Sequence, residues 1–132
     1  MSRRLLIVAA IAACAAPLSA AAHHSFAMYD LSRLVTLKGA VKTFRWSNPH
    51  AIVEITGSVD GGPVDTWTVE MTSPGNLVRL GWTRTTLVPG DKVTVRMAPL
   101  RNGQHGGGFR GITLADGRTM QGSVGDLEDA PK

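Results

Sequence analysis

Apolar and polar residues alternate along the chain between residues 34 and 121, in short runs separated by turn-forming residues. In the first run, 34–46, Val35 and Leu37 fall on one side of a predicted strand, and Phe44 falls on the other. A period of two is typical of strands that turn one face to a core. The other runs of this kind are 51–59, 64–72, 92–97, 109–114 and a shorter one at 118–121. The pattern therefore predicts five to six strands.

One segment between the third and fourth runs has helical signals instead. Ser73 is a favourable N-cap, Pro74 suits the first helical position, and Gly81 suits the end of a short helix. Three strands, a helix and two more strands follow the order of the OB-fold, a small Greek-key barrel. We therefore expect an all-β, OB-fold-like barrel over residues 34–121, with an open β-sandwich as the alternative. The glycine-rich stretch 102–108 is expected to be a flexible loop.

The first 22 residues have a different pattern. Arg3 and Arg4 precede an apolar, alanine-rich run that ends in small residues before His23. A basic start, an apolar stretch of about 7–15 residues and a small-residue end are typical of a secretory signal peptide. The run is shorter than the roughly 20 residues that a membrane span needs. We therefore expect residues 1–22 to be removed on export to the periplasm, and no transmembrane span.

The sequence leaves the point of cleavage open, and the choices differ chemically. Cleavage after Ala21 or Ala22 fits the small-residue rule and leaves a chain that starts at Ala22 or His23. Alternatively, residues 11–14 resemble the lipobox of bacterial lipoproteins, and Cys14 would then carry a lipid anchor that holds the protein on a membrane. Cys14 is the only cysteine, so the folded domain has no internal disulfide.

Size and charge exclude further classes of protein. The chain has 132 residues, which suits one domain. Its formal net charge is +4, and loss of Arg3 and Arg4 lowers this to about +2. So small a charge on an exported protein does not favour a nucleic-acid partner. Residues 122–132 are small and acidic, and we expect them to form a flexible tail.

Five short motifs occur in order in the exported part of the chain. They are His23-His24-Ser25-Phe26, Trp46-x-Asn48-Pro49-His50, Trp67-x-Val69-Glu70, Leu80-Gly81-Trp82 and Leu114-Ala115-Asp116-Gly117-Arg118. In this combination the chain resembles an exported proteobacterial family of unknown function (number 6152). The resemblance covers residues 23–119. It implies export and a small β-rich domain, and it implies no activity and no catalytic residue.

Histidine provides the candidate chemistry. His23 and His24 begin an N-terminal arm, residues 23–33, that follows the signal peptide. If His23 is the first residue, its ring and the free α-amine can chelate a copper ion. If Ala22 is the first residue, His24 is the third, and amine, backbone amides and imidazole make a square-planar site for Cu(II) or Ni(II). The further candidate ligands are His50, which would complete the site if the arm folds back over the second strand, and Glu54, Glu70 and Met28.

No catalytic motif is found: the chain has no nucleophile elbow, no zinc-protease helix and no phosphate-binding loop. We therefore expect a binding protein and not an enzyme, and two functions stay open. The first is periplasmic binding of copper or another divalent metal through the N-terminal histidine pair. The second is an envelope module that binds a polysaccharide or a partner protein through an exposed face formed by Phe44, Trp46 and Ile52. Each has a plainer alternative, because His50 can simply serve its turn and Trp46 can cap the barrel.

Overall fold

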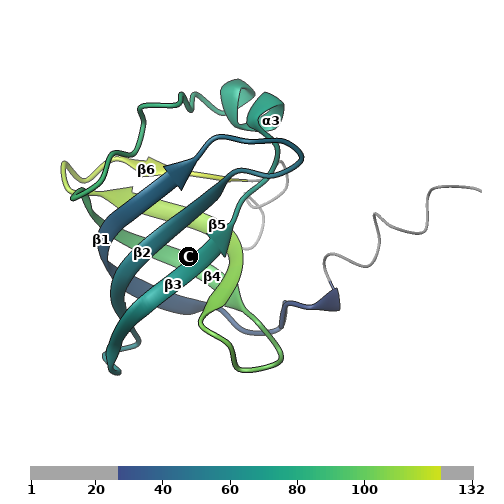
Figure 1. Ribbon diagram of the computed structural model, residues 1–132, viewed down its shortest axis with the longest axis vertical. Helices are drawn as coiled ribbons and strands as arrows, with labels where there is room; N and C mark the ends of the chain where they lie inside the picture. The colour runs from purple at the N-terminus through teal and green to yellow at the C-terminus, as the bar shows by residue number, and fades with distance from the viewer. Residues whose placement is uncertain (1–26, 123–132) are drawn as a thin grey trace, which may run out of the picture.

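The computed structural model describes residues 27–122, which form a single sheet and one short helix (Figure 1). The elements are β1 (Val35–Arg45), β2 (Ile52–Val59), β3 (Val64–Glu70), α3 (Pro74–Arg79), β4 (Lys92–Pro99), β5 (Gly106–Leu114) and β6 (Thr119–Met120). This order of elements agrees with the prediction of three strands, a helix and then further strands.

The sheet closes on itself to form a barrel. Neighbouring strands follow the order β3-β2-β1-β4-β5-β6, and β3 also pairs with β5 in parallel. The closing pairs run from Thr68 opposite Gly106 to Glu70 opposite Gly108. Five strands therefore make the closed barrel, and β6 pairs with β5 outside the closed ring, as Figure 1 shows. The predicted small, OB-fold-like barrel is confirmed, and the open sandwich is excluded.

Strand β5 begins earlier than the sequence predicts, and this corrects the expected flexible loop. Gly106, Gly107 and Gly108 belong to the strand and make the closing ladder with β3. A Cβ on Gly106 would lie 2.9 Å from the carbonyl oxygen of Thr68, and one on Gly107 would lie 2.6 Å from that of Ala98. The absence of side chains therefore lets β5 fit between β3 and β4. A glycine-rich composition alone does not show that the segment is a strand.

A β-bulge in β1 changes which residues face the core. The register with β2 shifts between Val41 and Thr43, so β1 contains one extra residue there. Beyond the bulge, Phe44 lies opposite Val53 on the inner face, and not on the outer face that simple alternation predicts. Phe44 and Trp46 pack against the core, with their ring centroids 5.8 Å apart.

Helix α3 closes one end of the barrel (Figure 1). The side chain of Ser73 caps it by accepting a hydrogen bond from the Asn76 amide (3.3 Å), as the sequence predicts. Leu77 of this helix is fully buried in the core. The indole of buried Trp82 donates a hydrogen bond to the carbonyl oxygen of Gln121 (2.7 Å) and so links the segment that follows β6 to the same region. Across residues 27–122, no helix has the length and apolar character needed to span a membrane.

Candidate functional site

Three side chains from separate parts of the chain meet beside the end of β3. His50 comes from the segment before β2, Glu70 is the last residue of β3, and Tyr29 comes from the N-terminal segment. The Nδ1 atom of His50 contacts Oε1 of Glu70. The hydroxyl of Tyr29 donates a hydrogen bond to Oε2 of the same carboxylate. Glu70 therefore joins the other two residues.

The hairpin of β2 and β3 positions His50 and Glu70. Ile52 lies directly opposite Glu70 in the ladder. The pairing continues at Ala51, whose carbonyl oxygen accepts a hydrogen bond from the Met71 amide (2.9 Å). His50 therefore lies next to the end of β3, which brings its ring within reach of the Glu70 carboxylate.

Tyr29 is held by the connection between β4 and β5. It forms an isolated bridge with Leu100, and the amide of Arg101 donates to the carbonyl oxygen of Met28 (2.9 Å). The ring of Tyr29 lies against Gly108, where an added Cβ would come within 3.3 Å of it. The side chain is only 6% exposed. The N-terminal segment is thus fixed to the barrel beside Glu70.

Burial raises the pKa of the Tyr29 phenol above its usual value, and the hydrogen bond and charge of Glu70 raise it further. Tyr29 therefore stays a protonated donor at neutral pH. The side chains of His50 and Glu70 remain 38% and 30% exposed, so solvent and ions reach them. A cavity of about 110 Å³ lies at this point, lined by the three residues together with Met71 and Phe109, among others.

The arrangement suits an imidazole that binds a metal ion. When Nδ1–H donates to a carboxylate, the lone pair of a neutral imidazole is on Nε2, and the carboxylate fixes the tautomer and the orientation of the ring. Both oxygens of Glu70 are engaged, one by His50 and one by Tyr29. Glu70 is therefore better suited to orient His50 than to bind the ion itself. Within residues 27–122, no three His, Cys, Asp or Glu side chains gather as a metal-binding group.

A family model described as a family of unknown function (DUF6152) matches residues 10–109. The chain belongs to this family. The match covers Tyr29, His50 and Glu70, and it confirms the family membership that the sequence motifs suggest. No curated protein and no solved structure matches the chain. Membership of this family therefore assigns the chain no function.

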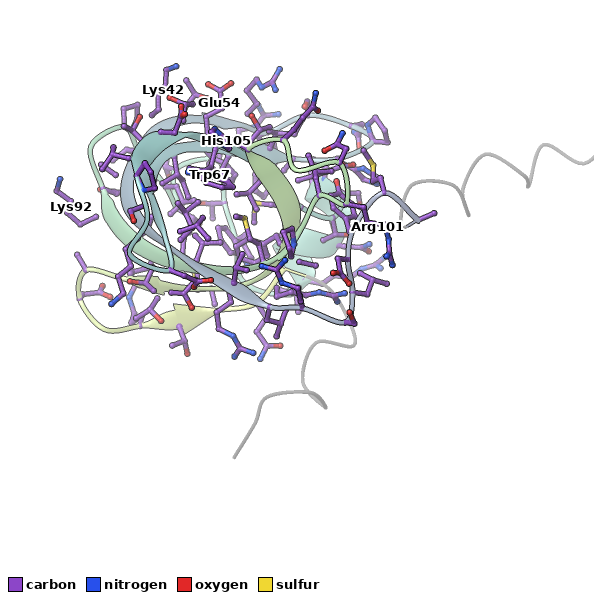
Figure 2. All side chains as sticks on the ribbon, turned by 90° about the horizontal axis from the view of Figure 1, so that it is seen from below. Lys42, Glu54, Trp67, Lys92, Arg101 and His105 are labelled. Carbon is purple, nitrogen blue, oxygen red and sulfur yellow. The ribbon has the colours of Figure 1, made fainter. Side chains whose placement is uncertain are left out.

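The remaining predicted site residues of this DUF6152 chain are dispersed. Glu54 accepts a hydrogen bond from the Thr43 hydroxyl (3.0 Å), and Figure 2 shows it on the outside of the barrel. Met28 is 48% exposed and directly precedes Tyr29. Ile52 is partly exposed beside Glu70. The predicted residues that lie outside the described part of the chain are Cys14, His23 and His24.

The sequence did not single out Tyr29, although it is the only tyrosine of the chain. Nor did it predict a second histidine–carboxylate pair, which lies between the β4–β5 connection and β3. There, Nδ1 of His105 is 3.0 Å from a carboxylate oxygen of Asp65. The His105 ring stacks on Trp67, whose side chain points into the barrel (Figure 2), at 4.5 Å between ring centroids. This pair is a natural comparison for His50 and Glu70.

Proposed function

We propose that this DUF6152 protein is exported to the periplasm and binds a divalent metal ion, with copper as the favoured metal, and that it acts by binding and not by catalysis. The observation that carries the proposal is the contact of His50 with Glu70, which prepares one imidazole for coordination on an accessible surface. His23 and His24 supply the further ligands.

Tyr29 supports the proposal because it fixes the N-terminal segment beside His50. Tyr29 and His50 contact the same carboxylate, that of Glu70. His24 precedes Tyr29 by five residues and His23 precedes it by six. An extended chain spans at most about 3.6 Å per residue, so both histidines stay within roughly 20 Å of Tyr29. This tether raises their effective concentration at His50.

The donor set favours copper. Three imidazoles and a free α-amine are ligands that suit Cu(II), which also binds nitrogen sites more tightly than the other common divalent metals. Met28 adds a thioether of the kind that Cu(I) prefers. A lipid-modified N-terminus at Cys14 would leave no free amine near the histidines. Copper binding as proposed therefore requires cleavage after Ala21 or Ala22.

The alternative, an envelope module that binds a polysaccharide or partner protein, has less support from the structure. Two of its three predicted contact residues, Phe44 and Trp46, pack against the core. Ile52 does not belong to that cluster, but a single partly exposed isoleucine provides little binding surface.

The test is copper titration of the exported protein after intact mass has established its N-terminus. We expect one Cu(II) per chain with submicromolar affinity, and binding at least about 10-fold weaker in His24→Ala and in His50→Ala. His105→Ala is the matched control, because it removes a histidine that also contacts a carboxylate, and it should leave the affinity unchanged. Absence of stoichiometric binding, or an equal loss in the control, would overturn the proposal.

Glu70→Gln tests the role assigned to the carboxylate. Glutamine can still accept the Tyr29 hydrogen bond, but it lacks the charge that orients and polarises His50. Losing such an outer partner typically weakens metal binding about 10–100-fold, and we expect a loss in this range. The free energy of unfolding should fall by only about 1 kcal/mol, because a neutral hydrogen bond replaces the charged one. Asp65→Asn is the matched control at the His105–Asp65 pair, and it should leave the copper affinity unchanged. Unchanged copper affinity in Glu70→Gln would show that Glu70 does not support a ligand.

A further inference from the structure

A larger cavity, of about 420 Å³, lies on the outer face of the barrel over β1, β4 and β5. Leu31 and Leu34 of the N-terminal segment line one part of it, and Met120 of β6 lines another. Partly exposed strand residues such as Thr36, Thr94 and Arg96 form its floor, and the buried core residue Ile112 also lines it. The volume falls within the range of small-molecule sites, about 300–1,000 Å³.

The strand ladders place Arg96 in the floor of this cavity. Thr36 of β1 lies opposite Arg96 on one side, and Gly111 of β5 lies opposite it on the other. Directly opposed side chains are about 4.5–5.5 Å apart at Cβ, so the Thr36 hydroxyl lies near the Arg96 side chain. Gly111 has no side chain, which leaves open space above β5. A bulge in the β4–β5 ladder adds Arg110, which also lines the cavity.

A second row of cross-strand neighbours adds hydroxyl groups to the same cavity. Thr94 of β4 lies opposite Thr113 of β5, which in turn lies opposite Thr119 of β6, and all three line the cavity. Lys38 of β1 lies opposite Thr94 on the other side and adds a positive charge at the margin. The floor thus combines cations with hydroxyls that can donate hydrogen bonds.

Among the residues that the structure describes, the charged side chains that line the cavity are those of Arg96 and Arg110, and none of the lining residues is acidic. Among the side chains of residues 27–122, no carboxylate pairs with the Arg96 guanidinium. A guanidinium binds carboxylate and phosphate oxygens through its fork of N–H donors. Leu31 and Leu34, which are 48% and 45% exposed, offer apolar contact beside this polar floor.

We infer that this cavity binds an amphipathic organic anion, whose carboxylate or phosphate head lies at Arg96 and whose apolar part lies between Leu31, Leu34 and Met120. The site is separate from the His50 cavity, although Leu31 and Arg110 line both. The inference does not depend on metal binding.

The test is isothermal titration of the full exported chain with three single-chain probes: decanoate, decyl phosphate and decylamine, each below its micelle-forming concentration. We expect one molecule of an anionic probe per chain and no binding of decylamine, because the positive charge of Arg96 repels the cation. The tighter of the two anions identifies the head group as carboxylate or phosphate. Arg96→Gln should weaken anion binding at least about 10-fold, since it removes the guanidinium fork.

Arg84→Gln is the matched control, because Arg84 is exposed between α3 and β4 and does not line the cavity. It should leave the affinity unchanged. If Arg96→Gln disturbs the fold, Gly111→Val provides a second test. A Cβ at Gly111 makes only an ordinary contact at 3.6 Å, so a larger side chain there should occupy the floor and block binding. Failure of both anions to bind, equal binding of decylamine, or unchanged affinity in Gly111→Val would overturn the inference.

Discussion

The phenol of Tyr29 should resist ionisation for as long as the barrel stays folded. Tyr29 is buried, and its hydroxyl donates to the carboxylate of Glu70. Loss of its proton would place a phenolate in a desolvated position next to a negative charge, which is why its pKa lies above the usual value. In the unfolded chain the same phenol ionises at about pH 10.

The effect on stability follows from this difference in pKa. The folded state keeps a proton that the unfolded state releases, so the stabilisation is complete below pH 10 and is lost as the pH rises. At pH 11 the loss amounts to about 1.4 kcal/mol. Tyr29→Phe has no phenol to titrate, so its stability does not fall in this pH range for the same reason. It also lacks the hydrogen bond to the charged Glu70, a bond worth about 2 kcal/mol. The variant should therefore be about 2 kcal/mol less stable than the wild type at pH 8 and only about 0.6 kcal/mol less stable at pH 11.

Two assays check this reasoning. Because the chain has one tyrosine, the ultraviolet absorbance of tyrosinate reports on Tyr29 alone. The folded protein should show no absorbance step near pH 10, whereas the protein in concentrated urea should show one. Urea unfolding of wild type and Tyr29→Phe at the two pH values then gives the stability difference. An absorbance step near pH 10 in the folded protein would refute the burial of this phenol against Glu70. So would a stability difference between wild type and Tyr29→Phe that is as large at pH 11 as at pH 8.

Four further substitutions test the barrel through its stability to unfolding and through its hydrogen exchange. Gly39→Ala places a Cβ 2.2 Å from a backbone carbonyl oxygen of β2 and should cost about 3 kcal/mol in urea unfolding. Gly75→Ala, where no atom lies within 4 Å of the new Cβ, should change stability by less than about 1 kcal/mol, and equal effects would contradict the close approach of β1 and β2. Leu77→Ala empties a fully buried site under α3 and should cost about 2–5 kcal/mol, so a negligible fall in melting temperature would show that the helix does not seal the barrel. Gly106→Ala places a Cβ 2.9 Å from the Thr68 carbonyl oxygen, so it should loosen the β3–β5 ladder and speed hydrogen exchange at the Thr68 amide, and unchanged exchange would argue against a tight ladder there.

Much of the fold could be predicted because local signals agree with the final structure. The alternation in β2 and the Ser73 cap both depend only on residues that are close together in the sequence. The errors arose where structure depends on a distant partner. The bulge in β1 exists only in relation to β2, and it moves Phe44 to the inner face. Gly106 and its neighbours carry no side-chain pattern, so only closure against β3 shows that they form a strand.

For the candidate site, too, the sequence predicted the local contacts and missed the distant one. His50 and Glu70 could be associated from the sequence because a single hairpin joins the strands that carry them. Tyr29 could not, since its contact with Glu70 spans 41 residues and depends on docking beside Leu100. No local periodicity encodes such a contact.

The glycine ladder between β3 and β5 should also govern how fast a metal ion would leave the proposed site. It spans three residue pairs, against eight between β1 and β2, and its β5 side contributes no side-chain packing. Short segments with few apolar contacts open locally more often than the whole domain unfolds. Glu70 is the last β3 residue in this ladder, opposite Gly108, so such an opening would release the carboxylate from His50. We therefore expect bound metal to exchange on the timescale of this local opening and not on that of global unfolding.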